Sequence, residues 1–314
     1  MTDDNRILAD ALVALQCEIA EEIHHQRQAE ICSQLYPDQG VMCRPLPKGG
    51  IAIRTLPVFM GKLNRAVGLG SQGTLSEDEH REVESMYLET GLDMEIHLSP
   101  FATSMTVESL IARGYEERVI LSTYHGFVDK LPDGSATTST FDKVTIRQIH
   151  QPLSTHEREQ FIESSIAGFQ TNGRPRELLG TLARIATERT DTVLFVARID
   201  DQIAGSAAMA KIESYKPDEA VAYLYLDSTL PEYRGRGVQQ ALIQARIHAA
   251  QCEGLSLLTT TTTVHDGSAR NAERAGLIAA YTAPVLIRPA SIQPGVIPLP
   301  SVAESASSVR TREK

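Results

Sequence analysis

The fold is decided by the stretch Tyr233-Arg234-Gly235-Arg236-Gly237-Val238-Gln239-Gln240-Ala241-Leu242. An apolar run, 220–226, precedes it and an amphipathic helix follows, so the sequence predicts a strand, a Gly/Arg-rich loop and a helix N-terminus in that order. Glycines let such a loop turn several N–H groups inward, and the helix dipole and two arginines add positive charge. The stretch therefore predicts a phosphate-binding site; the alternative is a solvated turn with two exposed arginines.

The composition indicates a folded globular protein. The chain has 314 residues, enough for two ordinary domains or one large one, with 42% hydrophobic and 22% charged residues. Its formal charge of −10 argues against a dedicated surface for nucleic acid or an anionic membrane, because such surfaces need clustered basic residues. A cationic or amine-bearing substrate is compatible with this charge.

The sequence shows no signal for export or membrane insertion. Its first residues lack a basic segment followed by an apolar core, and no run of about 18 apolar residues occurs, so we expect a cytoplasmic protein. The four cysteines are Cys17, Cys32, Cys43 and Cys252. Without close pairing or a CxxC motif they indicate reduced thiols, and their wide spacing from His24 and His25 favours packing over a zinc site. We therefore expect no metal.

A second glycine-rich stretch, 68–73, has the literal pattern GxGxxG after a strand-like run. The pattern raises the hypothesis of a nicotinamide-dependent oxidoreductase. Against it, Ser76 and Glu79 fit a capping box at the start of the next helix, so that helix N-terminus is already satisfied by its own side chains. Its carboxylates would repel a pyrophosphate, and we interpret the stretch as a glycine-rich connection.

The remaining pattern alternates strands and helices. In the N-terminal half we expect an amphipathic helix over 5–35, strands over 51–54, 94–98 and 119–124, and helices over 77–89 and 106–113. In the C-terminal half we expect strand 143–149, helices from Ser154 or Thr155 and over 176–187, a hairpin of 192–199 and 203–210, strand 257–264, helix 268–274 and strand 285–288.

Over 143–288 this order of elements resembles the GNAT superfamily of acetyl-CoA-dependent N-acetyltransferases. The segment Arg234-Gly235-Arg236-Gly237-Val238-Gln239 resembles the family signature [QR]xxGx[GA], placed just after the fourth strand. The segment from Ser268 to Leu277 resembles the family's Asn-bearing helix, which ends in a Gly-Phe pair. The resemblance implies an α/β fold whose mixed sheet splays between its fourth and fifth strands, with acetyl-CoA inserted there as co-substrate.

The resemblance also implies which residues hold acetyl-CoA. The loop amides would bind the pyrophosphate, the two loop arginines would assist, the end of the fourth strand would pair with the pantetheine amides, and the asparagine would lie beside the pantetheine or the thioester. These residues are Ser228, Thr229, Leu230, Arg234, Gly235, Arg236, Gly237, Val238, Gln239 and Asn271.

Two positions depart from the family pattern. Gln239 stands where the signature closes with Gly or Ala, so its side chain must point away from the phosphates or hydrogen-bond to them. Ala272 stands where many members carry a tyrosine that protonates the departing thiolate. The usual general acid is therefore missing, although a thiol with a pKa near 8.5 is a fair leaving group without one.

The sequence therefore leaves several candidates for the catalytic base and the catalytic acid. A protonated alkylamine must lose a proton before it attacks, so a base or a water relay is needed. The candidate bases are Asp227, Glu213 and His265, and each has a structural interpretation as a turn, strand-end or loop residue. The candidate acids are Tyr281 and Ser268, with a packing tyrosine and a helix N-cap as the alternatives.

The N-terminal half repeats the order of the C-terminal half. A strand, a short helix and a strand over 94–123 parallel the same elements over 257–288, and the stretch 68–73 takes the place of the Arg/Gly loop. We therefore predict a degenerate GNAT-like domain over 1–131, a linker over 132–142, a GNAT domain over 143–288 and a disordered tail over 289–314. Coincidental repetition of strand, loop and helix is the alternative.

We expect an enzyme that transfers an acetyl group from acetyl-CoA, by direct attack, to an amine of a small molecule, amino acid or peptide. The partners implied are that amine substrate and neither nucleic acid nor membrane, with a homodimer left open. The alternative, motivated by Ala272 and Gln239, is a CoA-binding regulatory module that does not turn over.

Overall fold

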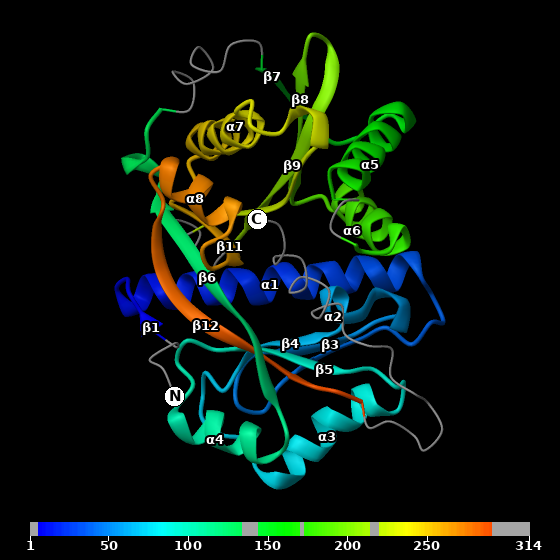
Figure 1. Cartoon of the computed structure of the whole chain (residues 1–314), viewed down its shortest axis with the longest axis vertical. Coiled ribbons are helices and arrows are strands. Elements are labelled where there is room, and N and C mark those ends of the chain that lie inside the picture. The colour runs from blue at the N-terminus through cyan, green and yellow to red at the C-terminus, as the bar shows by residue number, and fades with distance from the viewer. Residues whose placement is uncertain (1–5, 134–143, 170–172, 214–219, 291–314) are drawn as a thin grey trace, which may run out of the picture.

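The computed structural model describes residues 6–133, 144–169, 173–213 and 220–290. Within this part of the chain, twelve strands form one mixed sheet (Figure 1). Eleven of them follow the order β2-β3-β4-β5-β12-β6-β11-β10-β9-β8-β7, and β1 pairs with β12 beside this path. The predicted α/β class with a central mixed sheet is confirmed.

The chain is divided into elements as follows. The N-terminal half contains β1 (Arg6–Ile7), α1 (Ala11–Leu35), β2 (Met42–Pro45), β3 (Ile51–Arg54), α2 (Met60–Leu63), β4 (Arg65–Leu69), α3 (Glu77–Leu88), β5 (Met94–Leu98), α4 (Ser104–Ala112) and β6 (Glu116–Phe127). The C-terminal half contains β7 (Val144–Ile149), α5 (Thr155–Phe169), α6 (Arg176–Glu188), β8 (Thr192–Ile199), β9 (Gln202–Ile212), β10 (Val221–Thr229), α7 (Val238–Cys252), β11 (Leu257–Thr263), α8 (Gly267–Arg274) and β12 (Ile278–Arg288).

The two halves share one topology. In each, an antiparallel pair leads into a parallel pair joined by a helix: β3, β4, α3 and β5 in the first half, and β9, β10, α7 and β11 in the second. A short helix and a long strand then follow, α4 with β6 and α8 with β12. The tandem arrangement that the sequence predicted is present in the structure.

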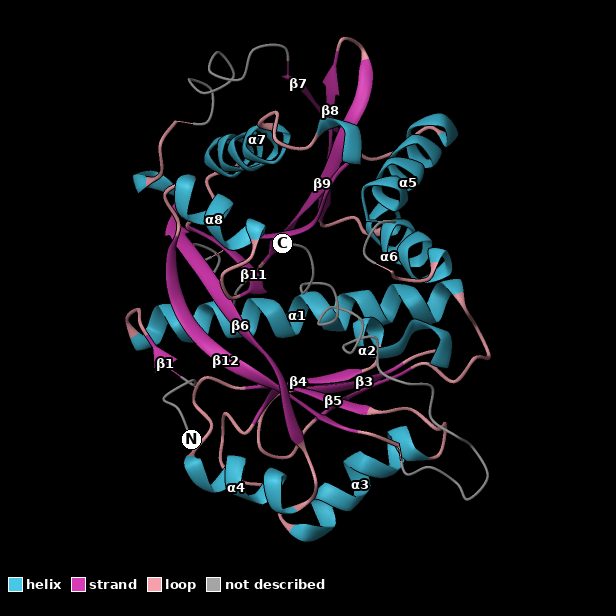
Figure 2. Ribbon diagram, in the orientation of Figure 1, coloured by secondary structure: helices cyan, strands magenta, loops and turns pink. Residues whose placement is uncertain are grey.

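The long strands of the two halves are exchanged. Strand β12 pairs with β5 on one side, whereas β6 pairs with β11, and the two strands also pair with each other. Each half therefore completes the sheet of the other (Figure 2). The predicted linker lies in the connection between them, but its residues 134–142, like those of the tail from 291, fall outside the described residues, so the predicted domain boundaries stay predictions.

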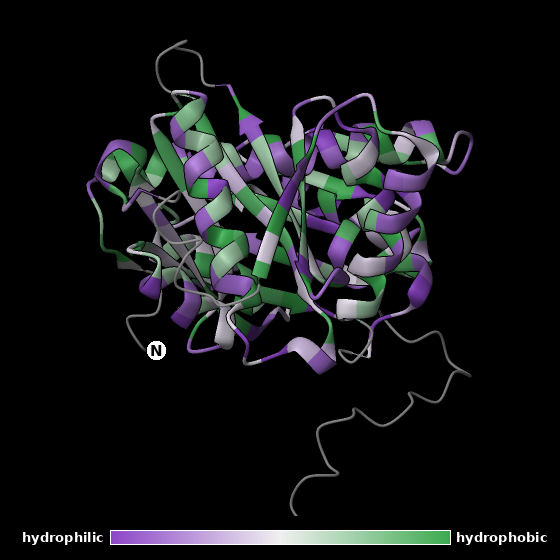
Figure 3. Cartoon of the chain, turned by 90° about the horizontal axis from the view of Figure 1, so that it is seen from above, coloured by the Kyte–Doolittle hydropathy of each residue, from purple (hydrophilic) through white to green (hydrophobic). Residues whose placement is uncertain are grey.

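Hydrophobic side chains pack between the sheet and its helices in each half. In the C-terminal half, Leu242 and Ile247 of α7 pack against Phe195 and Leu258 of the sheet, and in the N-terminal half Tyr87 of α3 lies in the corresponding core. Burial of a large apolar side chain contributes roughly 1.5–3 kcal/mol. Figure 3 shows hydrophobic residues mainly along the interior strands and many hydrophilic residues on the outer helices.

Helix α1 is the element that joins the two halves. It lies across the middle of the molecule, against β9 and β10 of one half and β3 and β4 of the other (Figure 1). An amphipathic helix was predicted here, and the helix is present, but its buried residues also include several polar ones. These are Glu18, Glu21, His24 and Gln28. Because α1 is covered from two sides, its polar residues face the interior between the halves.

Local signals in the sequence explain several element ends. Ser76 and Glu79 form the predicted capping box of α3, in which each side chain accepts a hydrogen bond from the other residue's backbone N–H. Ser154 accepts from the N–H of Glu157 at the start of α5. Strand β12 begins at Ile278, seven residues before the predicted strand over 285–288.

Candidate functional site

The Arg/Gly loop has the backbone of an anion site. Gly235 and Gly237 both adopt left-handed conformations, with φ of 74° and 81°. Gly237 is the N-cap of α7, and no side chain caps this helix. The first N–H groups of α7 are therefore directed outward with the positive end of the helix dipole, which is the arrangement that binds phosphate.

The two loop arginines have different surroundings. The guanidinium of Arg234 donates to the carbonyl of Gly168 at 3.1 Å and to that of Thr229 at 3.4 Å, so it ties the loop to the end of α5 and to β10. Arg236 is exposed, and its guanidinium lies over the ring of Tyr233, 5.4 Å from the ring centroid. Arg234 thus holds the loop in place, and Arg236 is the arginine whose charge is presented to solvent.

The side chain of Gln239 points toward α8. Its Oε1 accepts from Asn271 Nδ2 at 2.6 Å, and its Nε2 donates to Ser268 Oγ at 3.4 Å. Gln240 donates to the carbonyl of Asn271 at 2.7 Å. Of the two orientations that the sequence allowed for Gln239, the structure has the one that leaves the loop amides uncovered. Asn271 joins α8 to α7 through these bonds.

The sheet opens beside this loop. Strands β10 and β11 pair in parallel only from Val221 to Tyr223, opposite Leu257 to Thr259. Beyond that point β10 pairs with β9 alone and β11 with β6 alone. The separation lies between the fourth and fifth strands of the C-terminal half, where the family resemblance placed it. It leaves one edge of each strand able to accept an extended ligand.

The open end of β10 contains a bulge that positions Ser228, Thr229 and Leu230. The register with β9 shifts between Tyr225 and Ser228, and Leu226 has a φ of 57°. Ser228 Oγ lies 3.0 Å from Ser206 Oγ, and the N–H of Leu230 donates to the carbonyl of Ala204 at 3.0 Å. The strand end is therefore held from the β9 side, and its other edge faces the opening.

Asp227 forms an ion pair that sequence analysis did not foresee. Its two carboxylate oxygens contact Arg246, a fully buried residue of α7, with one N–O distance of 2.8 Å. Arg246 also donates to the carbonyls of Leu242 and Ala208. This bidentate pair stabilises the bulge against α7, and it engages the carboxylate that was proposed as the base. A catalytic role for Asp227 stays a prediction, with this geometry against it.

The candidate acids are separated in space. Ser268 lines the main cavity described below, whereas Tyr281 is buried in β12 beside Thr123 and lines a smaller cavity instead. The structural interpretation of Ser268 as the N-cap of this helix is wrong. Asp266 caps α8 instead, because its side chain accepts from the N–H of Ala269 at 2.8 Å. Ala272 lines the main cavity as well, so the position of the missing tyrosine faces the site.

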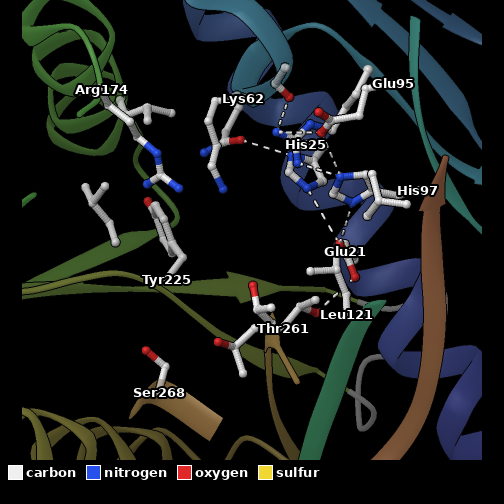
Figure 4. A pocket seen from close by; sticks show the side chains of 18 of the residues that line it. Glu21, His25, Lys62, Glu95, His97, Leu121, Arg174, Tyr225, Thr261 and Ser268 are labelled. Carbon is white, nitrogen blue, oxygen red and sulfur yellow. Dashed lines mark hydrogen bonds and ion pairs between the residues drawn. The ribbon is translucent and has the colours of Figure 1, made fainter. Parts of the chain in front are cut away.

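A cavity of about 830 Å³ extends from the opening to the N-terminal half. Its walls come from both halves: α7, α8 and the separated ends of β10 and β11 on one side, and α1, α2, β4 and β5 on the other. Neither Glu213 nor His265 lines it. Figure 4 shows the labelled side chains that reach into it from these elements. The splayed strands therefore open into a space that the N-terminal half closes.

A network of charged and histidine side chains starts at the open strand edge. Thr261 of β11 donates to Glu21 Oε2 at 3.0 Å. Glu21 Oε1 lies 3.8 Å from His25 Nε2 and 3.8 Å from His97 Nδ1. His97 Nε2 lies 2.9 Å from Arg65 Nη1 and 3.1 Å from Glu95 Oε1, and its Nδ1 faces Glu21 (Figure 4).

His25 is the histidine of this network that lies between Gln28 and Glu21. Its Nδ1 lies 3.2 Å from Gln28 Oε1, and its Nε2 is the ring nitrogen that faces Glu21. Burial lowers the pKa of His25, so the ring is neutral near pH 7. Burial alone would raise the pKa of Glu21, but contacts with His25 and His97 lower it overall, so this carboxylate is ionised.

The sequence contained a partial signal for this network. Glu21 and His25 are four residues apart on a predicted helix, and Glu95 and His97 are two apart on a predicted strand, so each pair shares a face. That the two faces meet depends on the packing of α1 against β5, which no local pattern predicts. Among the described residues, no group of three or more His, Cys, Asp or Glu residues is arranged to hold a metal ion.

The stretch 68–73 is a connection between β4 and α3. Gly68 packs against Gly50, and a Cβ there would also meet the carboxylate of Glu22. The capping box closes the helix N-terminus behind this stretch. In the described part of the chain, no helix is long and apolar enough to span a membrane.

Comparison with known proteins agrees with this geometry. Residues 155–277 match the model of the acetyltransferase (GNAT) family, so this part of the chain is a GNAT domain, and the predicted resemblance is confirmed. The match begins at α5 and ends after α8, and it therefore includes the Arg/Gly loop and the open strands. None of the curated proteins matches the chain.

Three solved structures share the fold over both halves. A GCN5-related N-acetyltransferase from Kribbella flavida is 18% identical, with 83% of this chain and 95% of that one covered and a TM-score of 0.55. A conserved protein of unknown function from Staphylococcus epidermidis is 11% identical, with coverages of 82% and 96% and a TM-score of 0.54. A tandem GNAT protein from the clavulanic acid biosynthesis pathway is 10% identical, with coverages of 92% and 98% and a TM-score of 0.53. The fold is thus a tandem GNAT fold.

Proposed function

We propose that this protein is an acetyl-CoA-dependent N-acetyltransferase. The observation that carries the proposal is the opening between β10 and β11, because it connects an uncapped helix N-terminus to a cavity that contains a neutral histidine. A ligand with a pyrophosphate and an extended amide arm matches the loop and the strand edge at once. The activated acetyl group at the end of that arm is the chemistry that acetyl-CoA supplies.

The residues present fit this co-substrate. The N–H groups after Gly237 would bind the pyrophosphate with Arg236 beside them, and the free edge of Ser228 to Leu230 would pair with the pantetheine amides. No carboxylate stands in the first turn of α7, so nothing there repels a phosphate. Asn271 and Gln239 would support the loop through their mutual bond instead of contacting the phosphates.

Acetyl transfer to an amine would use the network on α1. The bound ammonium first loses one proton to water, which makes the nitrogen a nucleophile. As this neutral amine forms its bond to the acetyl carbon and the carbon–sulfur bond breaks, His25 Nε2 takes the second proton. Glu21, 3.8 Å away, stabilises the resulting imidazolium. The sulfur leaves as a thiolate, since Ala272 offers no proton and a thiol pKa near 8.5 permits departure without one. Ser268, in the same cavity, is the hydroxyl that would stabilise it.

Substitution of the loop tests the proposal. We expect Arg234→Ala combined with Gly237→Val to weaken acetyl-CoA binding by about 3 kcal/mol, roughly 100-fold, from lost tethering and a blocked left-handed loop. Gly73→Val is the matched control, because Gly73 is also left-handed, with a φ of 113° and nothing within 4 Å of an added Cβ. Calorimetry that finds unchanged affinity in the double variant contradicts the proposal.

A CoA-binding module without turnover is the second candidate, and Ala272 is the observation that favours it. A thiol-release assay over a panel of amines separates the two. Acceptor-dependent release of CoA supports the enzyme, whereas tight binding of acetyl-CoA with no release from any amine supports the binding module.

A further inference from the structure

Two cations that line the cavity lack a hydrogen bond or ion pair with any residue that the structure describes. Among the described residues that line it, Arg65 and Arg118 pair with Glu95 at 3.5 and 3.1 Å, and Arg246 pairs with Asp227. No hydrogen bond or ion pair joins a described residue to either of the two remaining cations, Lys62 and Arg174. Two positive charges inside a cavity that make no ion pair with a described residue are suited to an anionic ligand.

Lys62 and Arg174 come from different halves and converge on one space. Lys62 lies on α2 of the N-terminal half, and Arg174 lies between α5 and α6 of the C-terminal half. Figure 4 shows their charged ends directed toward the same part of the cavity. Arg174 is half-buried, and Lys62 remains accessible to water within the cavity. The pair is therefore placed to hold a ligand that enters between the halves.

The electrostatics of Lys62 agree with this placement. The surrounding cavity walls lower its pKa to about 7, and the neighbouring Arg65 and Arg174 act in the same direction, while Glu95 and Glu21 oppose them. Burial likewise lowers the pKa of Arg174. The cavity walls thus remove much of the hydration of both cations, although water still reaches Lys62. An anion bound between the two cations would stabilise their charged forms in place of that hydration.

We propose that the acceptor is an amine that also carries an anionic group, a carboxylate or a phosphate, which Lys62 and Arg174 bind. This proposal rests on the proposed function. The anionic end lies at these cations, and the ammonium end lies at the ionised Glu21 beside His25, so the cavity recognises a molecule with opposite charges at its ends. A guanidinium forms two parallel bonds to a carboxylate or phosphate, and the lysine adds a point charge.

This assignment explains why the site needs both halves. The Arg/Gly loop and open strands belong to the C-terminal half, whereas Lys62 on α2 and Glu21 on α1 belong to the N-terminal half. The acceptor then bridges the halves, with its amine directed to the opening. The N-terminal half, which has no basic loop of its own, contributes acceptor recognition.

Matched acceptor pairs test the proposal. We would measure kcat/KM for ω-amino acids with two to five methylenes, for their neutral carboxamides and for aminoalkyl phosphates. We expect an acid to exceed its amide by about 100-fold, and Lys62→Met with Arg174→Met to abolish that advantage without changing the amide or the KM for acetyl-CoA. The ratio of phosphate to carboxylate activity identifies which anion is bound.

The control is Arg176→Met, two residues beyond Arg174, where the arginine is exposed and pairs with Glu163 at 2.8 Å. It should leave acids and amides unchanged, and thermal unfolding should show that all variants are folded. Equal use of acids and amides, or an equal loss for both in the double variant, overturns the proposal. A raised KM for acetyl-CoA also overturns it, because the two cations would then serve the co-substrate.

If the protein acetylates no amine, the proposed function is contradicted, but ligand binding can still test the anion site. Calorimetry with glutarate as the probe then decides. Binding to the wild-type protein that Lys62→Met with Arg174→Met weakens at least about tenfold supports the anion site. Absence of glutarate binding to the wild-type protein overturns it.

Discussion

The two halves of the sheet share a strand order but differ where their parallel strands end. In the N-terminal half, β4 and β5 pair from Ala66 as far as Leu69, and the N–H of Ser99 extends the contact to the carbonyl of Leu69. In the C-terminal half, β10 and β11 stop pairing at Tyr223 and continue with different neighbours. The same topology is closed in one half and open in the other.

The helices that connect these parallel strands, α3 and α7, also differ at their N-termini. Helix α3 begins with a capping box and three acidic residues in its first turn, so its N-terminal N–H groups have partners within the chain. Helix α7 begins at a left-handed glycine with no side-chain cap and no acid in its first turn. The difference teaches that the open strands and the uncapped helix occur together in one half, whereas the same topology in the other half has neither.

The closed half still contributes to the cavity. Because β6 and β12 are exchanged, β5 lies next to a strand from the other half, and its Glu95 and His97 face α1. Glu21 lies between this pair and Thr261 of the open strand. The N-terminal half therefore forms a wall of the cavity that carries carboxylate and histidine side chains, and substitution of Glu21 can separate a catalytic role of this wall from simple support.

Glu21→Gln carries the largest expected effect. Loss of the charge that stabilises a protonated His25 should lower kcat by 10²–10⁴, with an unchanged KM for acetyl-CoA. Because an anion no longer favours the imidazolium, the pKa of the acid limb of the pH–rate profile should also move down. Glu22→Gln is the control, since Glu22 lies against Gly68 and does not line the main cavity. Full activity of Glu21→Gln would reduce the N-terminal half to a scaffold.

The next effect concerns Glu18, a buried residue of α1. Burial raises its pKa to about 8 from an ordinary 4.5. The folded protein holds the proton that the unfolded chain releases above pH 4.5, so the stabilisation is present in full below that pH and is lost as the pH rises through 8. Linkage gives a loss of about 3 kcal/mol in the free energy of unfolding between pH 5 and pH 8.

Urea unfolding at several pH values measures this loss. Glu18→Gln keeps the shape of the neutral carboxyl at every pH and should reduce the dependence to the part that Glu22 contributes, because burial raises the pKa of Glu22 to about 7. Glu30→Gln, an exposed position on the same helix, should retain the dependence in full. An equal slope in Glu18→Gln and the wild-type protein would show that another group is responsible.

The open half was predictable because its signals are local. The glycines at 235 and 237 and the absence of a capping residue specify the loop, and the capping box of Ser76 and Glu79 specifies the opposite arrangement in the closed half. The order of elements within each half follows from hydrophobic periodicity. These features depend on residues within about ten positions of one another.

The exchange of strands and the composition of the cavity were not predictable in this way. Strand β12 begins with small residues and contains Pro284, so only its apolar end resembled a strand, and nothing local shows that it pairs with β5. Glu21 lies on the predicted amphipathic helix and Lys62 lies outside the predicted elements, and no local pattern distinguishes either residue. Glu21 and Thr261 are hydrogen-bonded although 240 residues separate them in the chain. The pairing of Asp227 with Arg246 spans only 19 residues, but it depends on how α7 packs against β10.

The smallest expected effect comes from making the open half resemble the closed one. Glu79 is the third residue of α3, and Gln240 occupies the same place in α7. Gln240→Glu should lower acetyl-CoA affinity about tenfold, roughly 1.4 kcal/mol, because a carboxylate at the helix N-terminus repels a pyrophosphate. The converse change, Glu79→Gln, retains a side chain able to cap α3 and should leave the affinity unchanged.

A second variant separates charge from structure at this position. Gln240 Nε2 donates to the carbonyl of Asn271 at 2.7 Å, and Gln240→Glu also removes this bond. Gln240→Met removes the donor without adding charge, so it should lower affinity by no more than about threefold. The defect of Gln240→Glu should shrink at high ionic strength, as screening requires, while that of Gln240→Met should not. Equal, salt-independent losses in both variants would mean that the link between α7 and α8, and not the uncapped N-terminus, distinguishes the open half from the closed one.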